Sequence, residues 1–82
     1  MPRKKRDIRR DYRDMGFSER RGKGDHTIFK HPLVPDDYAV DGVDGKDAKR
    51  YDEKKLGEAR KALAEARARV RRQQQQKGPG KP

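Results

Sequence analysis

The sequence predicts an α+β fold: a three-stranded antiparallel sheet with two helices on one face, in the order helix, three strands, helix. Two segments with apolar residues at helical spacing flank a middle segment rich in glycine, proline and strand-forming residues. The chain has 82 residues, which is the size of one small domain. We expect residues 1–72 to form that domain and residues 73–82 to form a disordered polar tail.

The first helix is predicted by a single apolar face. Ile8, Tyr12 and Met15 are spaced so that they fall on one side of a helix. Charged residues fill most of the positions between them. Gly16 follows directly, and glycine is the residue most often found just beyond the end of a helix.

Three short strands are expected between the helices. Residues 17–21 and residues 26–31 are separated by Gly22-Lys23-Gly24, and glycine permits the tight turn between two antiparallel strands. Pro32 and Pro35 indicate a loop, after which residues 38–41 are expected to form the third strand. Because consecutive strands usually pair, we expect a meander with both helices on one of its faces.

A long helix is expected from about Asp47 to Arg72. Its apolar positions form one narrow stripe, made by Tyr51, Leu56, Ala59, Leu63, Ala66 and Val70. We therefore expect Tyr51 to be a core residue. The arginines of this helix are expected mainly to keep its outer face soluble, although they also offer a track for phosphates. Residues 73–82 consist of glutamine, glycine, proline and lysine and predict disorder.

The charge of the chain indicates a polyanionic partner. Lys and Arg number 24 against 14 Asp and Glu, which gives a formal net charge of +10. Such an excess favours nucleic acid or an anionic membrane, because bound cations release the counterions of the polyanion. A membrane surface fits less well, since the apolar stripe of the last helix is mostly alanine. No apolar run approaches the roughly 20 residues of a membrane span.

The absence of cysteine limits the chemistry of the chain. It excludes disulfides, thiol catalysis and zinc sites built on cysteine. It also fits a reducing cytoplasm, where we expect the protein to act. The basic residues at the N-terminus are not followed by an apolar stretch, so they do not form a secretory signal.

Two blocks of the sequence resemble a known family. Residues 16–32, GFSERRGKGDHTIFKHP, resemble the characteristic segment of the HicA toxins of bacterial toxin–antitoxin systems. The residues that carry this resemblance are Gly16, Phe17, Arg20, Arg21, Gly24, Asp25, His26, Phe29, His31 and Pro32. Residues 42–54 are similar to the stretch that leads into the last helix of that family, through Gly45, Asp47, Ala48, Lys49, Tyr51, Glu53 and Lys54.

The resemblance implies both a fold and an activity. The fold would be like that of a double-stranded-RNA-binding domain. The activity would be that of an endoribonuclease that cleaves messenger RNA, with His26 as its catalytic residue and a HicB-type antitoxin as its inhibitor. The chain departs from the common family pattern at Asp25, where serine is frequent, in the acidic loop 33–37, and in the long basic segment after Leu63.

Cleavage of RNA by its own 2′-hydroxyl needs a proton acceptor and a cation near the phosphate, and it requires no metal or cofactor. Histidine suits the first task, because an unperturbed imidazole has a pKa of about 6.5. Side chains alternate along a strand, so His26 and Lys30 face solvent if Phe29 packs beneath the helices. His31 then lies on the side of Phe29 and is expected to be a structural residue.

The RNA contacts are expected to come from the cations near His26 in the sequence. These candidates are Arg20, Arg21, Lys23 and Lys30, together with Gly24, whose backbone can approach a phosphate closely. The alternative is a non-catalytic RNA-binding module that uses the same basic surface. The two possibilities differ at His26, which an enzyme needs and a binding module does not.

Overall fold

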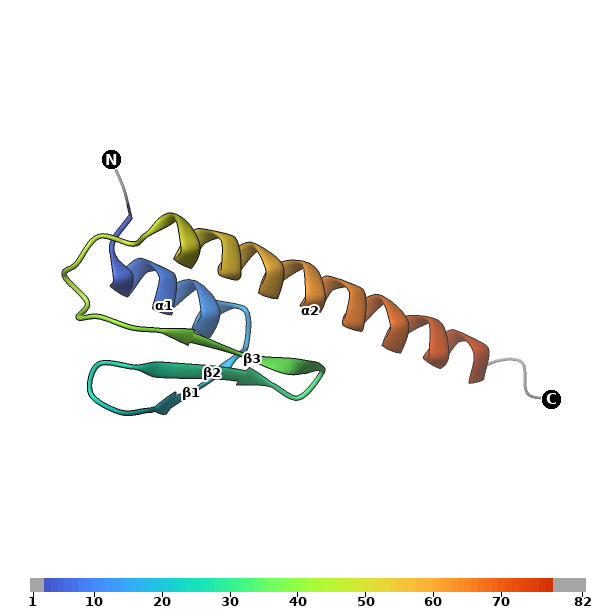
Figure 1. Ribbon diagram of the computed structural model, residues 1–82. Coiled ribbons are helices and arrows are strands. Elements are labelled where there is room, and N and C mark those ends of the chain that lie inside the picture. The colour runs from blue at the N-terminus through green and yellow to red at the C-terminus, as the bar shows by residue number, and fades with distance from the viewer. Residues whose placement is uncertain (1–2, 78–82) are drawn as a thin grey trace.

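The computed structural model describes residues 3–77, which form two helices and three strands. Figure 1 shows their order as α1 (Lys5–Asp14), β1 (Ser18–Arg21), β2 (Thr27–His31), β3 (Val34–Val40) and α2 (Arg50–Lys77). The strands form one sheet in the order β1-β2-β3, and both strand pairs are antiparallel. The predicted α+β class and the predicted order of the elements are confirmed.

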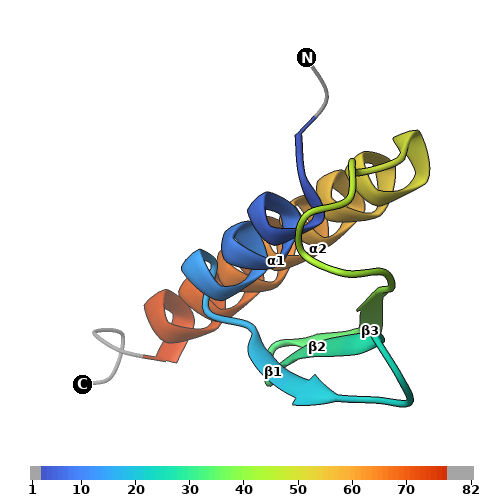
Figure 2. The same ribbon diagram turned by 90° about the vertical axis from the view of Figure 1, so that its left-hand side faces the viewer.

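Both helices lie on the same side of the sheet, as Figure 2 shows. The alternation of side chains along β2 follows from this arrangement. Thr27 and Phe29 are buried beneath the helices, whereas Ile28 is half-buried and Lys30 is exposed on the opposite face. Within residues 3–77 no element covers that opposite face.

α1 begins and ends as its sequence predicts. The backbone N–H of Lys4 donates a hydrogen bond to Asp7 Oδ2 over 3.0 Å, and a carboxylate in the first turn also complements the helix dipole. After the last turn, Gly16 has a φ of 96°, a conformation that costs glycine little. Ile8 and Tyr12 are fully buried, so the predicted apolar face is confirmed.

β3 is longer than expected because Pro35 lies inside the strand. The strand runs from Val34 to Val40, whereas the expectation was residues 38–41. Proline cannot donate a ladder hydrogen bond and is therefore found mainly on edge strands. β3 is an edge strand and Pro35 is exposed. The strand therefore tolerates the missing N–H of Pro35.

α2 starts a little later than expected and extends further. It begins at Arg50 and continues to Lys77. The backbone N–H of Lys49 donates to Asp52 Oδ2 over 2.8 Å, which caps the first turn. The helix also includes residues 73–77, which we expected in the disordered tail. Four of these five residues are glutamine, which is a good helix former, and this explains the longer helix. Residues 78–82, the rest of the expected tail, lie outside the described residues.

The buried stripe of α2 contains Asp52 where Tyr51 was expected. The side chains of Asp52, Leu56, Ala59, Leu63 and Ala66 are buried, whereas Tyr51 is 61% exposed. Tyr51 stands five residues before Leu56, about 140° around the helix from it. This angle turns Tyr51 away from the core, so the expectation that it is a core residue is wrong.

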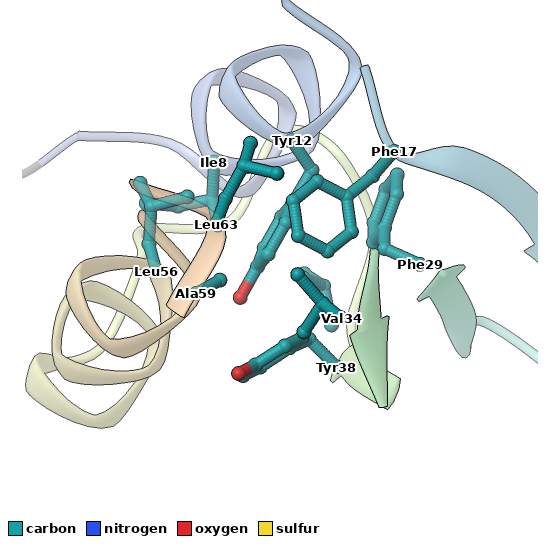
Figure 3. Close-up of a cluster of buried hydrophobic side chains, with 10 residues drawn as sticks. Ile8, Tyr12, Phe17, Phe29, Val34, Tyr38, Leu56, Ala59 and Leu63 are labelled. Carbon is teal, nitrogen blue, oxygen red and sulfur yellow. The ribbon is translucent and has the colours of Figure 1, made fainter. Parts of the chain in front are cut away.

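An aromatic cluster forms the centre of the core (Figure 3). The ring of Tyr12 stacks on Phe29 with their centroids 4.7 Å apart, and Phe17 meets Tyr12 edge-on at 5.5 Å. The cluster is enclosed by Ile8, Val34, Tyr38, Leu56, Ala59 and Leu63. Burial raises the pKa of the Tyr12 hydroxyl. The two helices and the sheet thus meet at one stack of rings.

Candidate functional site

His26 is the last residue of the turn between β1 and β2. Its backbone carbonyl accepts a hydrogen bond from the N–H of Gly22 (2.9 Å), and its own N–H donates to the carbonyl of Lys23 (3.0 Å). Gly24, with a φ of 57°, makes the reversal of the chain possible. β2 begins only at Thr27, so His26 stands at the end of the sheet, where it is exposed.

A first hollow opens beside His26, between the turn, α1 and the loop after β3. It is lined by Arg9, Arg13, Glu19, Arg21, Gly24, Asp25, His26, Thr27, Gly42, Val43 and Asp44. Arg13 Nη1 lies 2.9 Å from Glu19 Oε1, and Arg21 is exposed. The hollow is thus lined by His26 together with Arg13 and Arg21, and a guanidinium group can stabilise a phosphate.

The guanidinium of Arg9 ties together the segments that form this hollow. Arg9 is 6% exposed, and a guanidinium offers five N–H donors in one plane. It donates to Thr27 Oγ1 (3.0 Å), to Asp44 Oδ1 (2.7 Å) and to the carbonyl oxygens of Asp25 (2.9 Å), Val40 (3.2 Å) and Gly42 (2.6 Å). Because Asp25 directly precedes His26, Arg9 helps to position the histidine.

His26 also lines a second hollow, on the side of α2. The other residues of this hollow are Ala39, Asp41, Lys49, Tyr51 and Asp52. Thr27 pairs with Val40 across the antiparallel strands β2 and β3. His26 directly precedes Thr27 and Asp41 directly follows Val40, so the two residues lie at the same end of the sheet. The imidazole of His26 and the carboxylate of Asp41 therefore line the same hollow.

Lys5 holds the carboxylates of the second hollow. Its Nζ lies 2.7 Å from Asp52 Oδ2 and 3.3 Å from Asp41 Oδ1. Burial lowers the pKa of Lys5, but the hydrogen bonds to Asp52 and Asp41 outweigh burial, so the pKa is raised overall. The hydrogen bond from Lys5 lowers the pKa of Asp41. Asp41 is therefore an anion near His26 over the whole neutral range.

The structure brings some of the predicted site residues together and separates others. Arg21 and Gly24 line the first hollow with His26. Arg20 pairs with Ile28 and lies on the uncovered face of the sheet. Lys30 lies on the same face near the far end of β2, where its Nζ is 3.7 Å from Asp37 Oδ2. His26 and Lys30 are both exposed, as expected, but Lys30 does not line either hollow beside His26, and its contact with RNA stays a prediction.

The two remaining predictions concern Lys23 and His31. Lys23 is exposed in the turn, where its side chain is free of the packing of the sheet. His31 is half-buried, and its ring meets Phe17 edge-on with centroids 5.2 Å apart. His31 Nδ1 accepts a hydrogen bond from the N–H of Leu33 over 3.1 Å. These contacts agree with the expectation that His31 is a structural residue.

Sequence reasoning missed Arg9, Asp41 and Tyr51 as neighbours of His26. Arg9 is one of many charged residues in the first helix, and nothing in its spacing separates it from those that face solvent. Asp41 is expected at the end of the third strand, and the sequence does not indicate which side chain it contacts. Tyr51 was assigned to the core, although its interval of five residues from Leu56 was a signal that it lies off the apolar stripe.

Within residues 3–77 no group of three or more potential metal-ligating side chains lies close enough together to hold a metal ion. In the same part of the chain, neither helix combines the length and the apolar character needed to cross a membrane. In comparisons with known proteins, no family model, no curated protein and no solved structure matches the chain. The likeness to a double-stranded-RNA-binding domain therefore rests on the order of helices and strands.

Proposed function

We propose that this protein is a metal-independent endoribonuclease that cleaves messenger RNA, and that it is the toxin component of a cytoplasmic toxin–antitoxin system. The observation that carries the proposal is the position of His26. It is exposed at the end of the sheet, lines a hollow with Arg13 and Arg21, and lies near the carboxylate of Asp41. The resemblance of residues 16–32 and 42–54 to the HicA toxins adds support.

The chemistry that fits these residues is attack of the 2′-hydroxyl of RNA on the adjacent phosphate. His26 accepts the proton of the 2′-hydroxyl as the bond from the 2′-oxygen to phosphorus forms. Arg21 stabilises the negative charge that grows on the phosphate. The bond from phosphorus to the 5′-oxygen breaks, and that oxygen receives a proton from the imidazolium or from water. The products are a 2′,3′-cyclic phosphate and a 5′-hydroxyl.

The inhibitor that we propose is an acidic protein of the HicB type. Such a partner would bind over the two hollows and exclude RNA from His26. The support for it is the resemblance to the HicA toxins and the net charge of +10, since a basic surface selects partners of opposite charge.

Replacement of the proposed base tests the enzyme. The purified protein is incubated with end-labelled RNA in the presence of a chelator, with DNA of the same sequence as a control that lacks the 2′-hydroxyl. We expect wild type to cleave RNA but not DNA, and His26→Ala to cleave about 10²- to 10⁴-fold more slowly. RNA affinity should be retained. The unfolding free energy should change by no more than about 0.5 kcal/mol, because His26 is exposed.

His31→Ala is the matched control, since it also removes one imidazole from the same hairpin. We expect it to lower the unfolding midpoint more than His26→Ala does and to retain cleavage when assayed well below that midpoint. If wild type binds RNA without cleaving it, the protein is better described as a non-catalytic RNA-binding module. If wild type cleaves RNA and His26→Ala cleaves at the same rate, the assignment of His26 as the catalytic residue fails.

A further inference from the structure

Tyr51 is the exception among the aromatic residues of the chain. Tyr12, Phe17, Phe29 and Tyr38 are at most 7% exposed, whereas Tyr51 is 61% exposed. In a chain with five aromatic residues and a thin core, a tyrosine ring outside the core gives up a large contribution to stability. A single exposed ring is ordinary on a protein surface, so what matters is where this one lies.

Tyr51 lies in the first turn of α2 and lines the second hollow with His26. Cations flank the ring: Lys49 lines the same hollow, and Lys55 Nζ lies 5.7 Å from the ring centroid. The carboxylates of the hollow, Asp41 and Asp52, are both bonded to Lys5, which offsets part of their charge. The hollow thus combines an exposed aromatic ring, the imidazole of His26 and the ammonium group of Lys49, and Lys55 lies beside the ring outside the hollow.

We infer that Tyr51 is a stacking platform for an unpaired RNA base next to the phosphate held at His26. The inference rests on the proposed function and narrows it, because it names single-stranded RNA as the substrate. Proteins that bind single strands combine cations along the backbone with aromatic rings on which bases stack. In a duplex the faces of the bases are already stacked on one another, so a ring such as Tyr51 finds no partner there.

The contacts of Tyr51 within the chain do not account for its position. The cation–π contact joins a half-buried lysine, Lys55, to an exposed ring, and such contacts contribute only about 0.5–1 kcal/mol near the surface. Lys55 also pairs with Glu58, whose Oε1 lies 3.4 Å from its Nζ. The start of α2 is capped by Asp52 rather than by Tyr51. Replacing Tyr51 should therefore leave the fold intact.

Equilibrium binding to defined oligonucleotides tests the inference in the full-length protein. The probe is a 2′-O-methyl oligoadenylate, which cannot be cleaved because its 2′-oxygen cannot attack the phosphate. We expect Tyr51→Ala to weaken binding of this single strand by about 5- to 100-fold, the range for one lost base–aromatic stack. Tyr51→Phe should bind as wild type does, because it retains the ring. Thermal unfolding of both variants verifies that they are folded.

Two further probes separate stacking from electrostatics. An abasic oligonucleotide of the same length and a duplex of the oligoadenylate with oligouridylate present phosphates without accessible base faces, so Tyr51→Ala should bind both as wild type does. The slope of log affinity against log salt should also be unchanged in Tyr51→Ala. Lys49→Gln is the matched ionic control, and it should reduce that slope by about 0.7 if Lys49 contacts one phosphate.

Several outcomes would overturn the inference. Tyr51→Ala could bind the single strand as tightly as wild type, or lose affinity equally for the abasic and duplex probes. Tyr51→Phe could lose as much affinity as Tyr51→Ala, which would assign the contact to the hydroxyl. These results leave the ribonuclease proposal standing. If wild type cleaves no RNA but Tyr51→Ala still loses affinity for the single strand alone, the ribonuclease proposal fails and the stacking platform stands.

Discussion

Lys5 is the residue whose loss should cost the fold most. Its side chain and that of Asp52 are 3% and 2% exposed, so removing the ammonium leaves a carboxylate buried without its partner. We expect Lys5→Met to lower the free energy of unfolding by about 3–5 kcal/mol, the usual cost of breaking a buried ion pair. Urea denaturation measures this change.

Lys4→Met is the matched control, because the neighbouring Lys4 pairs with Asp47 over 2.7 Å with side chains that are 41% and 57% exposed. It should change the unfolding free energy by less than about 1 kcal/mol. Equal losses in the two variants would contradict the role given to burial.

The difference in unfolding free energy between Lys5→Met and wild type should also decrease as the pH falls. A carboxyl whose pKa is lowered on folding, as that of Asp41 is, stabilises the fold above the ordinary aspartate value of about 3.9 and loses this contribution as the pH falls through its lowered pKa.

α2 is the element that most exceeds its predicted role. Figure 1 shows it running well past the end of α1 and past the turn between β2 and β3. Ala66 is the last buried residue among the side chains of this helix that the structure describes, and no acidic residue follows Glu65 in the sequence. Arg69, Arg71 and Arg72 are exposed on this overhanging part. A basic helix of this kind offers phosphate contacts at a distance from His26.

Neutralising two of these arginines tests that contribution. If each contacts one phosphate, Arg69→Gln combined with Arg72→Gln should reduce the slope of log affinity against log salt by about 1.4 for single-stranded RNA. Glutamine is a good helix former, so the fold should not change. Arg6→Gln combined with Arg10→Gln removes the same charge from α1. Equal effects of the two pairs would mean that net charge alone, and not the overhang of α2, governs binding.

The sequence predicted elements better where one physical signal dominates than where two compete. In α1, the apolar face and the glycine after it indicate the same helix, and the structure has that helix. In β3, Pro35 outweighed the strand signal in the prediction, because the sequence does not reveal that this strand is an edge. In α2, Tyr51 was expected in the core because it is aromatic, although its position around the helix places it outside the apolar stripe. The burial of Asp52 was not predicted, because its partner Lys5 lies far away in the sequence.

At the scale of the whole molecule, the site could be predicted only as far as it is local. His26, Arg21 and Gly24 come from one hairpin, so their proximity follows from the turn between them. The remaining walls of the two hollows come from α1, the loop after β3 and the start of α2. Which residues of those segments meet the hairpin depends on how the two helices pack against the sheet, which hydrophobic periodicity does not specify.

Arg9 connects α1 to the turn before β2 and to the end of β3, and this has a consequence for how the molecule moves. One guanidinium bonds to the backbone before His26, at the end of β3 and in the loop beyond it. Neither segment can open without breaking bonds that also hold the other, so the two should fluctuate as one cooperative unit.

Arg9→Lys, which cannot reproduce a planar set of five donors, should speed amide hydrogen exchange in residues 24–27 and residues 41–44 together while leaving the centre of β2 slow. Arg10→Lys, at an exposed position of the same helix, should leave both segments as they are. Faster exchange in only one of the two segments would mean that they open separately. The two segments beneath the hollow would then be independent loops, and a ligand such as the RNA proposed above would order them one after the other.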